Sequence, residues 1–178
     1  MSGAAVLAPA SPTLHPTADA GFAVYVHWPF CLAKCPYCDF NSHVRAAPVD
    51  EARYVAAFKA ELAHRAALAP GREVSSIFFG GGTPSLMPAK DLGRVIELLK
   101  QRWQFAPDIE ITMECNPDTL SLQSLEEYRA IGINRISIGM QSANQKVLKI
   151  LDRTHNPENV ELSVSNARKA GFDNVSLD

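Results

Sequence analysis

An α/β fold made of repeated βα units is predicted by two features of the sequence. Short runs rich in β-branched and aromatic residues alternate with longer amphipathic segments, which is the pattern of a parallel sheet with crossover helices. The 178 residues are 47% hydrophobic and 20% charged, as in an ordinary folded domain. Such units either close into a barrel or spread into an open doubly wound sheet, and the pattern alone allows both.

Five apolar runs are expected to be the strands. Ile109, Ile111 and Met113 alternate with polar residues, which is typical of a strand with one buried face. Because the chain stops at Asp178 within the last run, we expect it to be the N-terminal part of a longer fold. The predicted strands are 21–28, 74–80, 109–115, 135–141 and 174–178.

Apolar residues recur at helical spacing between these strands, so each connection is expected to contain a helix that packs one apolar stripe on the sheet. Asn156 and Pro157 form a typical cap and first-turn pair, and Gly132 and Gly171 are expected helix stops. The residues expected to face the core are Val55, Phe58, Leu62, Leu92, Val95, Ile96, Leu99, Leu125, Tyr128, Ile131, Val160, Val164 and Ala167.

Residues 1–20 are expected to be a disordered tail, because alanine, proline, serine and threonine dominate them and bury little surface. Residues 21–178 are expected to form the core domain. No run approaches the roughly 18 apolar residues of a membrane span. With 17 basic and 19 acidic residues, the chain lacks the excess positive charge of a nucleic-acid-binding surface. Its cysteine pattern does not fit a disulfide framework, so we expect a cytoplasmic protein.

Three of the four cysteines lie in the short stretch CLAKCPYC. Cys31, Cys35 and Cys38 are too close together for an unstrained disulfide framework, but their thiolates can hold zinc or an iron-sulfur cluster. Zinc would need a fourth ligand such as His27 or His43, and structural zinc sites usually use two separated pairs of ligands. A 4Fe-4S cluster held by three cysteines would instead leave one iron free to bind a small molecule.

Other candidate site residues follow the predicted strands, where the ligands of βα folds bind. The glycine run 80–82 lets backbone groups approach a ligand closely, although a tight turn would also explain it. Glu114, Gln141 and Asp178 could hydrogen-bond ribose hydroxyls or an ammonium group. Cys115 is expected to be a buried core thiol rather than a fourth cluster ligand.

The histidines and aromatic residues near these positions have plainer explanations. His43, His64 and His155 are expected to be solvent-facing or loop residues rather than catalytic bases. Trp28 and Phe30 precede the first cysteine directly. They are expected to pack the cysteine loop against the sheet, which would also shield its ligand from water.

Four segments carry a resemblance to a known family. They read YVHWPFCLAKCPYCDFNSH, FFGGGTPSL, IEITMECNPDTL and INRISIGMQSANQKVLKILDRTH, and the resemblance extends from about residue 22 to residue 178. Together they resemble the oxygen-independent coproporphyrinogen III oxidase family of the radical S-adenosylmethionine (SAM) superfamily. The resemblance implies an incomplete TIM-like (βα) radical SAM barrel with a 4Fe-4S cluster, whose open iron chelates SAM and whose electron splits it into methionine and a 5'-deoxyadenosyl radical.

The resemblance also implies roles for individual residues. Cys31, Cys35 and Cys38 would ligate the cluster. The residues that match contacts with the first SAM are Tyr25, Gly81 and Glu114. The residues that match contacts with a second SAM, which the oxidase binds, are Tyr37, Gly82, Thr83, Gln141, Arg153 and Asp178.

One position favours a particular branch of this family. Oxidases carry an additional cysteine two residues after the last cluster ligand, and here that residue is Phe40. This resembles the HemW-like branch of heme chaperones, which implies binding of heme and its delivery to respiratory hemoproteins. The heme-binding signature of that branch lies in a C-terminal domain outside this chain. The alternatives are an oxidase acting on coproporphyrinogen III with electrons from a donor protein, and a plain electron carrier or zinc module.

Overall fold

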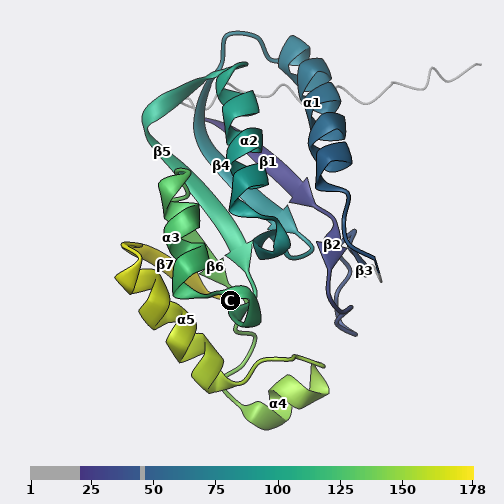
Figure 1. Cartoon of the computed structure of the whole chain (residues 1–178), viewed down its shortest axis with the longest axis vertical. Coiled ribbons are helices and arrows are strands. Elements are labelled where there is room, and N and C mark those ends of the chain that lie inside the picture. Colours follow the sequence, from purple (N-terminus) through teal and green to yellow (C-terminus); the bar gives the residue numbers. More distant parts are fainter. Residues whose placement is uncertain (1–20, 45–46) are drawn as a thin grey trace, which may run out of the picture.

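Five parallel strands form the central sheet of this computed structural model, which describes residues 21–44 and 47–178 (Figure 1). The strands lie in the order β1-β4-β5-β6-β7, so each one pairs with the next strand of the sheet along the chain. This sequential parallel order is that of successive βα units, and it confirms the predicted α/β fold. The bounds are β1 (Phe22–Trp28), β4 (Glu73–Gly81), β5 (Gln104–Cys115), β6 (Arg135–Ile138) and β7 (Asn174–Leu177).

The helices begin and end at residues with clear local reasons. The side chain of Asn156 caps the last helix by accepting from the backbone N–H of Asn159, and Pro157 occupies its first turn, as predicted. Gly132 and Gly171 adopt positive φ angles of 104° and 87° just after two helices, which confirms both stops. The helices are α1 (Glu51–Leu68), α2 (Ala89–Lys100), α3 (Leu122–Ala130), α4 (Gln145–Ile150) and α5 (Pro157–Lys169), with short 3-10 turns at Pro84–Leu86 and Pro117–Thr119.

The hydrophobic core lies between one face of the sheet and the helices. Figure 1 shows α1, α2, α3 and α5 following one another along that face, and each contacts the next. Burial of apolar side chains there is the main favourable contribution to folding. The fully buried residues include Ile77, Phe79, Met113, Ile136 and Ile138 from the strands and Leu92, Val95, Ile96, Leu99 and Leu125 from the helices.

On the strands, the side chains that alternate with the buried core residues form a polar chain, that is, a row of polar side chains joined by hydrogen bonds. Arg135 donates to Thr112 Oγ1 at 3.4 Å and to Ser176 Oγ at 3.3 Å. Ser176 donates to Ser137 Oγ at 3.1 Å, which links the chain to the carboxyl ends of the strands. Thr112 donates in turn to Glu110 at 2.8 Å. This second face of the sheet is therefore polar over β5, β6 and β7, whereas over β1 and β4 it carries the stacked rings of Tyr25 and Phe78.

The structure corrects two boundaries and adds three elements. Strand β5 begins at Gln104 rather than 109, because Gln104 and Phe105 still pair with Glu73 and Val74. Strand β6 ends at Ile138 rather than 141, so the predicted strand was too long. The short parallel pair β2 (Phe30–Cys31) with β3 (His43–Val44), and helix α4, were not predicted.

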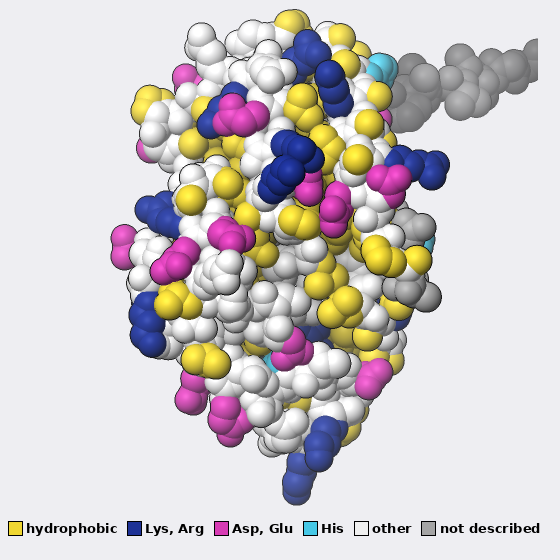
Figure 2. All heavy atoms as spheres, in the orientation of Figure 1, with side chains coloured by type: hydrophobic (Ala, Val, Ile, Leu, Met, Phe, Trp, Pro, Cys, Tyr) yellow, Lys and Arg dark blue, Asp and Glu magenta, His cyan; other side chains and the backbone are white. Residues whose placement is uncertain are grey.

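Three further predictions concern the N-terminal tail, membrane-spanning helices and the charge of the surface. The expected disordered tail, 1–20, lies outside the described residues. Across residues 21–44 and 47–178, no helix is both long enough and apolar enough to cross a membrane. Figure 2 shows basic and acidic side chains interspersed on the face that the helices cover.

Candidate functional site

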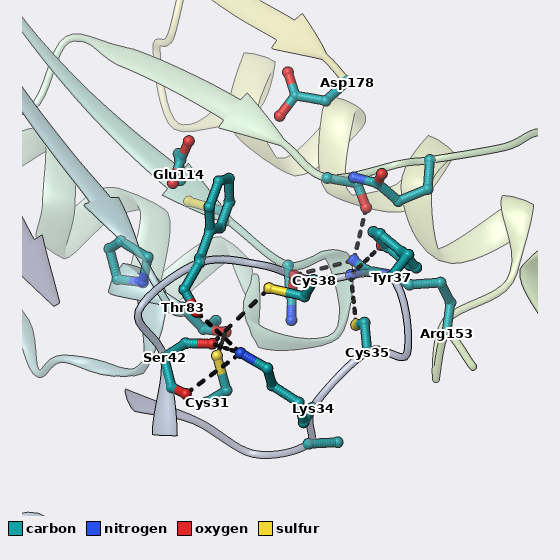
Figure 3. A pocket seen from close by; sticks show the side chains of 18 of the residues that line it. Cys31, Lys34, Cys35, Tyr37, Cys38, Ser42, Thr83, Glu114, Arg153 and Asp178 are labelled. Carbon is teal, nitrogen blue, oxygen red and sulfur yellow. Dashed lines mark hydrogen bonds between the residues drawn. The ribbon is translucent and has the colours of Figure 1, made fainter. Parts of the chain in front are cut away.

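A pocket of about 320 Å³ lies at the carboxyl ends of the strands, between the sheet and the cysteine loop (Figure 3). This is the edge at which parallel βα folds bind their ligands. All predicted site residues line it except Tyr25, Gly80 and Gly81. Its walls are formed by Cys31, Ala33, Lys34, Cys35, Tyr37, Cys38, Phe40, Ser42, Gly82, Thr83, Pro84, Glu114, Cys115, Asn116, Ser137, Gly139, Gln141, Arg153 and Asp178.

The cysteine loop is folded back on itself. Its two ends are joined because β2 pairs with β3 and the N–H of His43 donates to Pro29 O at 2.7 Å. Inside the loop, Lys34 Nζ donates to the carbonyl oxygen of Phe40 at 3.0 Å and to Ser42 Oγ at 2.8 Å. These bonds hold the loop around its three cysteines.

Aromatic packing fixes the loop to the sheet. Trp28 is almost completely buried, and its ring meets those of Phe30 and Tyr54 edge to face at 5.1 and 4.9 Å between centroids. Tyr54 also donates from its hydroxyl to His27 O at 2.6 Å, which ties α1 to the end of β1. The predicted packing role of Trp28 and Phe30 is therefore confirmed.

The donor set in the pocket is three thiols on one loop, which is the kind of ligand that iron-sulfur clusters use. Cys31, Cys35 and Cys38 are free, half-buried thiols on one loop. In the described part of the chain, no three His, Cys, Asp or Glu side chains are arranged to hold one ion. A cubane binds each cysteine through a different iron, so its ligands need not meet at one point. His27 and His43, the histidines considered as zinc ligands, are not among the residues that line the pocket.

The glycine run 80–82 at the end of β4 lets three chain segments approach closely. A Cβ on Gly82 would lie 2.6 Å from Phe30 O and 3.0 Å from Cys31 Sγ, so no larger residue fits there. The N–H of Gly82 donates to Trp28 O at 2.6 Å, and that of Thr83 donates to Phe30 O at 2.9 Å. These amides therefore hold the cysteine loop, and the expected approach of a ligand to the glycine run stays a prediction.

Glu114 and Tyr25 lie together on the two sides of the glycine run. A Cβ on Gly80 would meet Tyr25 Cε2 at 2.9 Å and Glu114 Oε2 at 3.0 Å. The N–H of Gly81 donates to Glu114 Oε2 at 3.2 Å. Tyr25 stacks on Phe78 at 6.1 Å and is more than half exposed, outside the walls of the pocket. The three residues matched to the first SAM are therefore neighbours, although Glu114 alone faces the pocket.

Arg153 connects the cysteine loop to the strand ends. Its Nη1 donates to Cys35 Sγ and to Tyr37 OH, both at 3.5 Å. Its Nη2 donates to Asn116 Oδ1 at 3.0 Å and to Gly139 O at 2.9 Å. Its Nε is buried and has no partner among the described residues. Figure 3 shows Arg153 and Tyr37 on the same side of the pocket.

Asp178 and Gln141 form the wall opposite the loop. The N–H of Gln141 donates to Asp178 O at 2.7 Å, and Gln141 adopts a positive φ of 63°. Asp178 Oδ1 accepts from Ser137 Oγ at 2.9 Å. This hydrogen bond orients the carboxylate at the end of the polar chain on the sheet.

Sequence reasoning missed Ser42, Ser137 and Gly139 as pocket residues, whereas Lys34 and Asn116 lie in stretches expected at the site, 29–41 and 114–118. Asn116 directly follows β5, so its place after a strand was a usable signal. Ser137 lies between two buried isoleucines, so its polar side chain had to point to the other face. For Lys34 the only signal was its place between two cysteines.

The remaining cysteine and histidines differ in burial. Cys115 is buried, its thiol donates to Met113 O at 3.6 Å, and burial raises the pKa of that thiol. It is therefore a core residue, as predicted. His43 and His64 are exposed. His155 lies in the loop between α4 and α5, as expected, but it is buried and its Nε2 bonds Met140 O at 3.0 Å, so it does not face solvent.

The family model of the radical SAM superfamily matches residues 25–178, almost all of the described chain. The chain belongs to the radical SAM superfamily. Membership implies a 4Fe-4S cluster and SAM as cofactors, which agrees with the donor set in the pocket.

Comparison with individual proteins shows which members of this superfamily the chain is similar to. The heme chaperone HemW from Escherichia coli strain K12 is 41% identical over 88% of this chain and 41% of its own length. HemW from Mycobacterium tuberculosis strain CDC 1551 is 38% identical over 94% of this chain and 43% of its own. The solved structure of coproporphyrinogen III oxidase (HemN), a radical SAM enzyme from E. coli, matches with a TM-score of 0.80 and 35% identity, over 89% of this chain and 36% of that one. The chain thus spans less than half the length of these relatives.

Proposed function

We propose that this chain is the cluster- and SAM-binding part of a heme chaperone of the HemW type. In this proposal residues 21–178 form the radical SAM core, and Cys31, Cys35 and Cys38 hold the cluster. Heme would bind to the full-length protein and pass from it to respiratory hemoproteins. The cytoplasmic location stays a prediction.

The pocket supplies the groups that the cofactors would need. A bound 4Fe-4S cluster with three cysteine ligands would have one iron without a protein ligand, which can chelate SAM. The cluster would also pass on an electron that it receives from a donor protein. Glu114 and Asp178 present carboxylates from the strand ends, where they can accept hydrogen bonds from ribose hydroxyls or an ammonium group. Arg153, Tyr37 and Gln141 complete the wall that the family resemblance matches to a second SAM.

Phe40 is the observation that carries the choice of chaperone over oxidase. It lines the pocket two residues after Cys38 and is 58% exposed, so its ring is not a core residue that packing requires. At this position the oxidases carry an additional cysteine. The identities to the two HemW proteins, 41% and 38%, also exceed the 35% identity to the oxidase.

The oxidase is the second candidate, because the HemN structure superimposes on nearly the whole described chain. In that case the protein would decarboxylate coproporphyrinogen III oxidatively. The pocket residues matched to SAM do not distinguish the two functions, because the family resemblance assigns them to both.

A pair of anaerobic assays on the complete gene product tests these functions. After reconstitution with iron and sulfide, heme is titrated into the protein and followed by its absorbance. We expect saturable binding of about one heme per chain and no conversion of coproporphyrinogen III to protoporphyrinogen. Conversion in the presence of SAM and a reductant would establish the oxidase instead, and absence of stoichiometric heme binding would contradict the chaperone.

A further inference from the structure

Two of the thiols in the pocket each accept a hydrogen bond from a residue far away in the sequence (Figure 3). Thr83 donates from Oγ1 to Cys31 Sγ at 3.5 Å, from the segment that follows β4. Arg153 donates from Nη1 to Cys35 Sγ at 3.5 Å, from the loop that follows α4. Neither donor belongs to the cysteine loop, so the fold of the sheet brings them to the sulfurs.

The third thiol has a partner inside the loop. Ser42 Oγ lies 3.9 Å from Cys38 Sγ. Lys34 Nζ donates to the same Ser42 oxygen at 2.8 Å and so occupies one of its lone pairs. A hydroxyl that accepts from an ammonium group still has its own hydrogen to donate. Ser42 can therefore donate to Cys38, and each thiol has at least one polar side chain within hydrogen-bond distance.

The positive charges beside the cysteines act in the same direction as these hydrogen bonds. Lys34 and Arg153 both line the pocket and bring positive charge to the cysteine side. Glu114 and Asp178 stand on the strand side. Donors and cations around cluster sulfurs stabilise the more negative, reduced state, which raises the reduction potential.

We propose that Thr83, Ser42 and Arg153 are positioning residues that raise the reduction potential of the cluster by donating to its three cysteine sulfurs. This inference rests on the proposed cluster site and not on heme binding. It gives Thr83 and Arg153 a role that does not depend on contact with SAM.

A pair of substitutions at Thr83 separates this role from simple packing. Thr83→Val keeps the branched shape and removes the donor, whereas Thr83→Ser keeps the donor and changes the shape. The reconstituted full-length protein is titrated anaerobically with dithionite, without SAM, and the reduced cluster is followed by electron paramagnetic resonance. For Thr83→Val we expect the ratio of reduced to oxidised cluster at a fixed potential to fall about tenfold, or about 59 mV for a one-electron couple. Thr83→Ser should stay near the wild type.

Two more variants keep the test decisive. Thr112→Val removes a fully buried hydroxyl that bonds Glu110 and Arg135 on the same sheet, and its potential should match the wild type. Ser42→Ala should shift the reduction potential in the same direction as Thr83→Val. If Thr83→Val fails to assemble a cluster, the potential of Ser42→Ala tests the inference instead. Wild-type protein without a cluster would refute the cluster site itself. A wild-type cluster with unchanged potentials in Thr83→Val and Ser42→Ala would overturn this inference.

Discussion

The carboxylate of Glu114 accepts a hydrogen bond of 3.2 Å from the backbone N–H of Gly81, on the neighbouring strand. Burial raises the pKa of Glu114, the hydrogen bond from Gly81 lowers it, and the negative charge of Asp178 raises it further. The net shift is upward from the ordinary value of 4.5. The site thus holds a carboxyl group that ionises less readily in the folded protein than in the unfolded chain.

This shift predicts how Glu114 affects stability as pH changes. Because the folded pKa is raised, the folded state binds the proton more tightly, and stability is lost as pH rises from 4.5 through the folded pKa. Glu114→Gln cannot ionise, so the free energy of unfolding of the wild type should fall relative to the variant over this window. Urea unfolding of the cluster-free protein at a series of pH values measures it. If the difference in free energy of unfolding between the wild type and Glu114→Gln is constant from pH 4 to 7, the pKa of Glu114 is not raised in the folded protein.

Gly82→Ala should prevent the cysteine loop from closing. The added methyl group would meet Phe30 O at 2.6 Å and Cys31 Sγ at 3.0 Å, and backbone cannot move aside as a side chain can. We expect a several-fold loss of iron and sulfide after anaerobic reconstitution, measured by metal analysis.

Gly93→Ala is the matched control for this change. Gly93 lies inside α2, where the nearest atom to an added methyl group is a side-chain carbon of Ile131 at 3.3 Å. The control should keep its iron, because α2 does not contribute to the pocket. Full iron content in Gly82→Ala would show that the close approach of β4 to the loop is not needed for the cluster.

The sheet could be predicted because its signals are local. Ile136 and Ile138 are completely buried, as the alternating pattern indicated. Gly132 and Gly171 stop their helices because a positive φ favours glycine wherever it occurs in a fold. Patterns of this kind depend only on neighbouring residues.

The errors arise where distant segments decide the local structure. Met140 continues the apolar alternation, but β6 has already ended, because Gln141 turns to pair with the backbone of Asp178. Likewise, β2 and β3 have only two residues each, too few for a pattern to reveal their pairing. The contact between Arg153 and Cys35 joins residues 118 positions apart, so no local signal could have indicated it.

Asn134→Ala should destabilise the fold at the junction of β5 and β6. Asn134 Oδ1 accepts from the N–H of Ile111 at 2.8 Å, and its Nδ2 donates to Ile109 O at 2.7 Å. Loss of both bonds leaves a strand amide without a partner and should cost about 2 kcal/mol of the free energy of unfolding. Chemical denaturation measures this loss. Gln123→Ala removes one exposed bond to Glu127 and should change stability by less than about 0.5 kcal/mol.

Ser137→Ala tests whether Asp178 must be held in place to bind SAM. Ser137 Oγ donates to Asp178 Oδ1 at 2.9 Å and accepts from Ser176 at 3.1 Å, so it fixes the carboxylate at the pocket wall. Without it, Asp178 can rotate, and loss of about 1 kcal/mol of binding free energy would raise the SAM dissociation constant about fivefold. Isothermal titration of the cluster-loaded full-length protein measures the constant.

Ser163→Ala provides the matched control for this last change. Ser163 lies on α5 and is also buried, but its hydroxyl bonds Pro117 O and Asn159 O, outside the pocket walls. Its SAM affinity should equal that of the wild type, because the hydroxyl it loses orients no pocket residue. If Ser137→Ala keeps its cluster and binds SAM as tightly as Ser163→Ala does, the carboxylate of Asp178 does not contribute to SAM binding through this hydrogen bond.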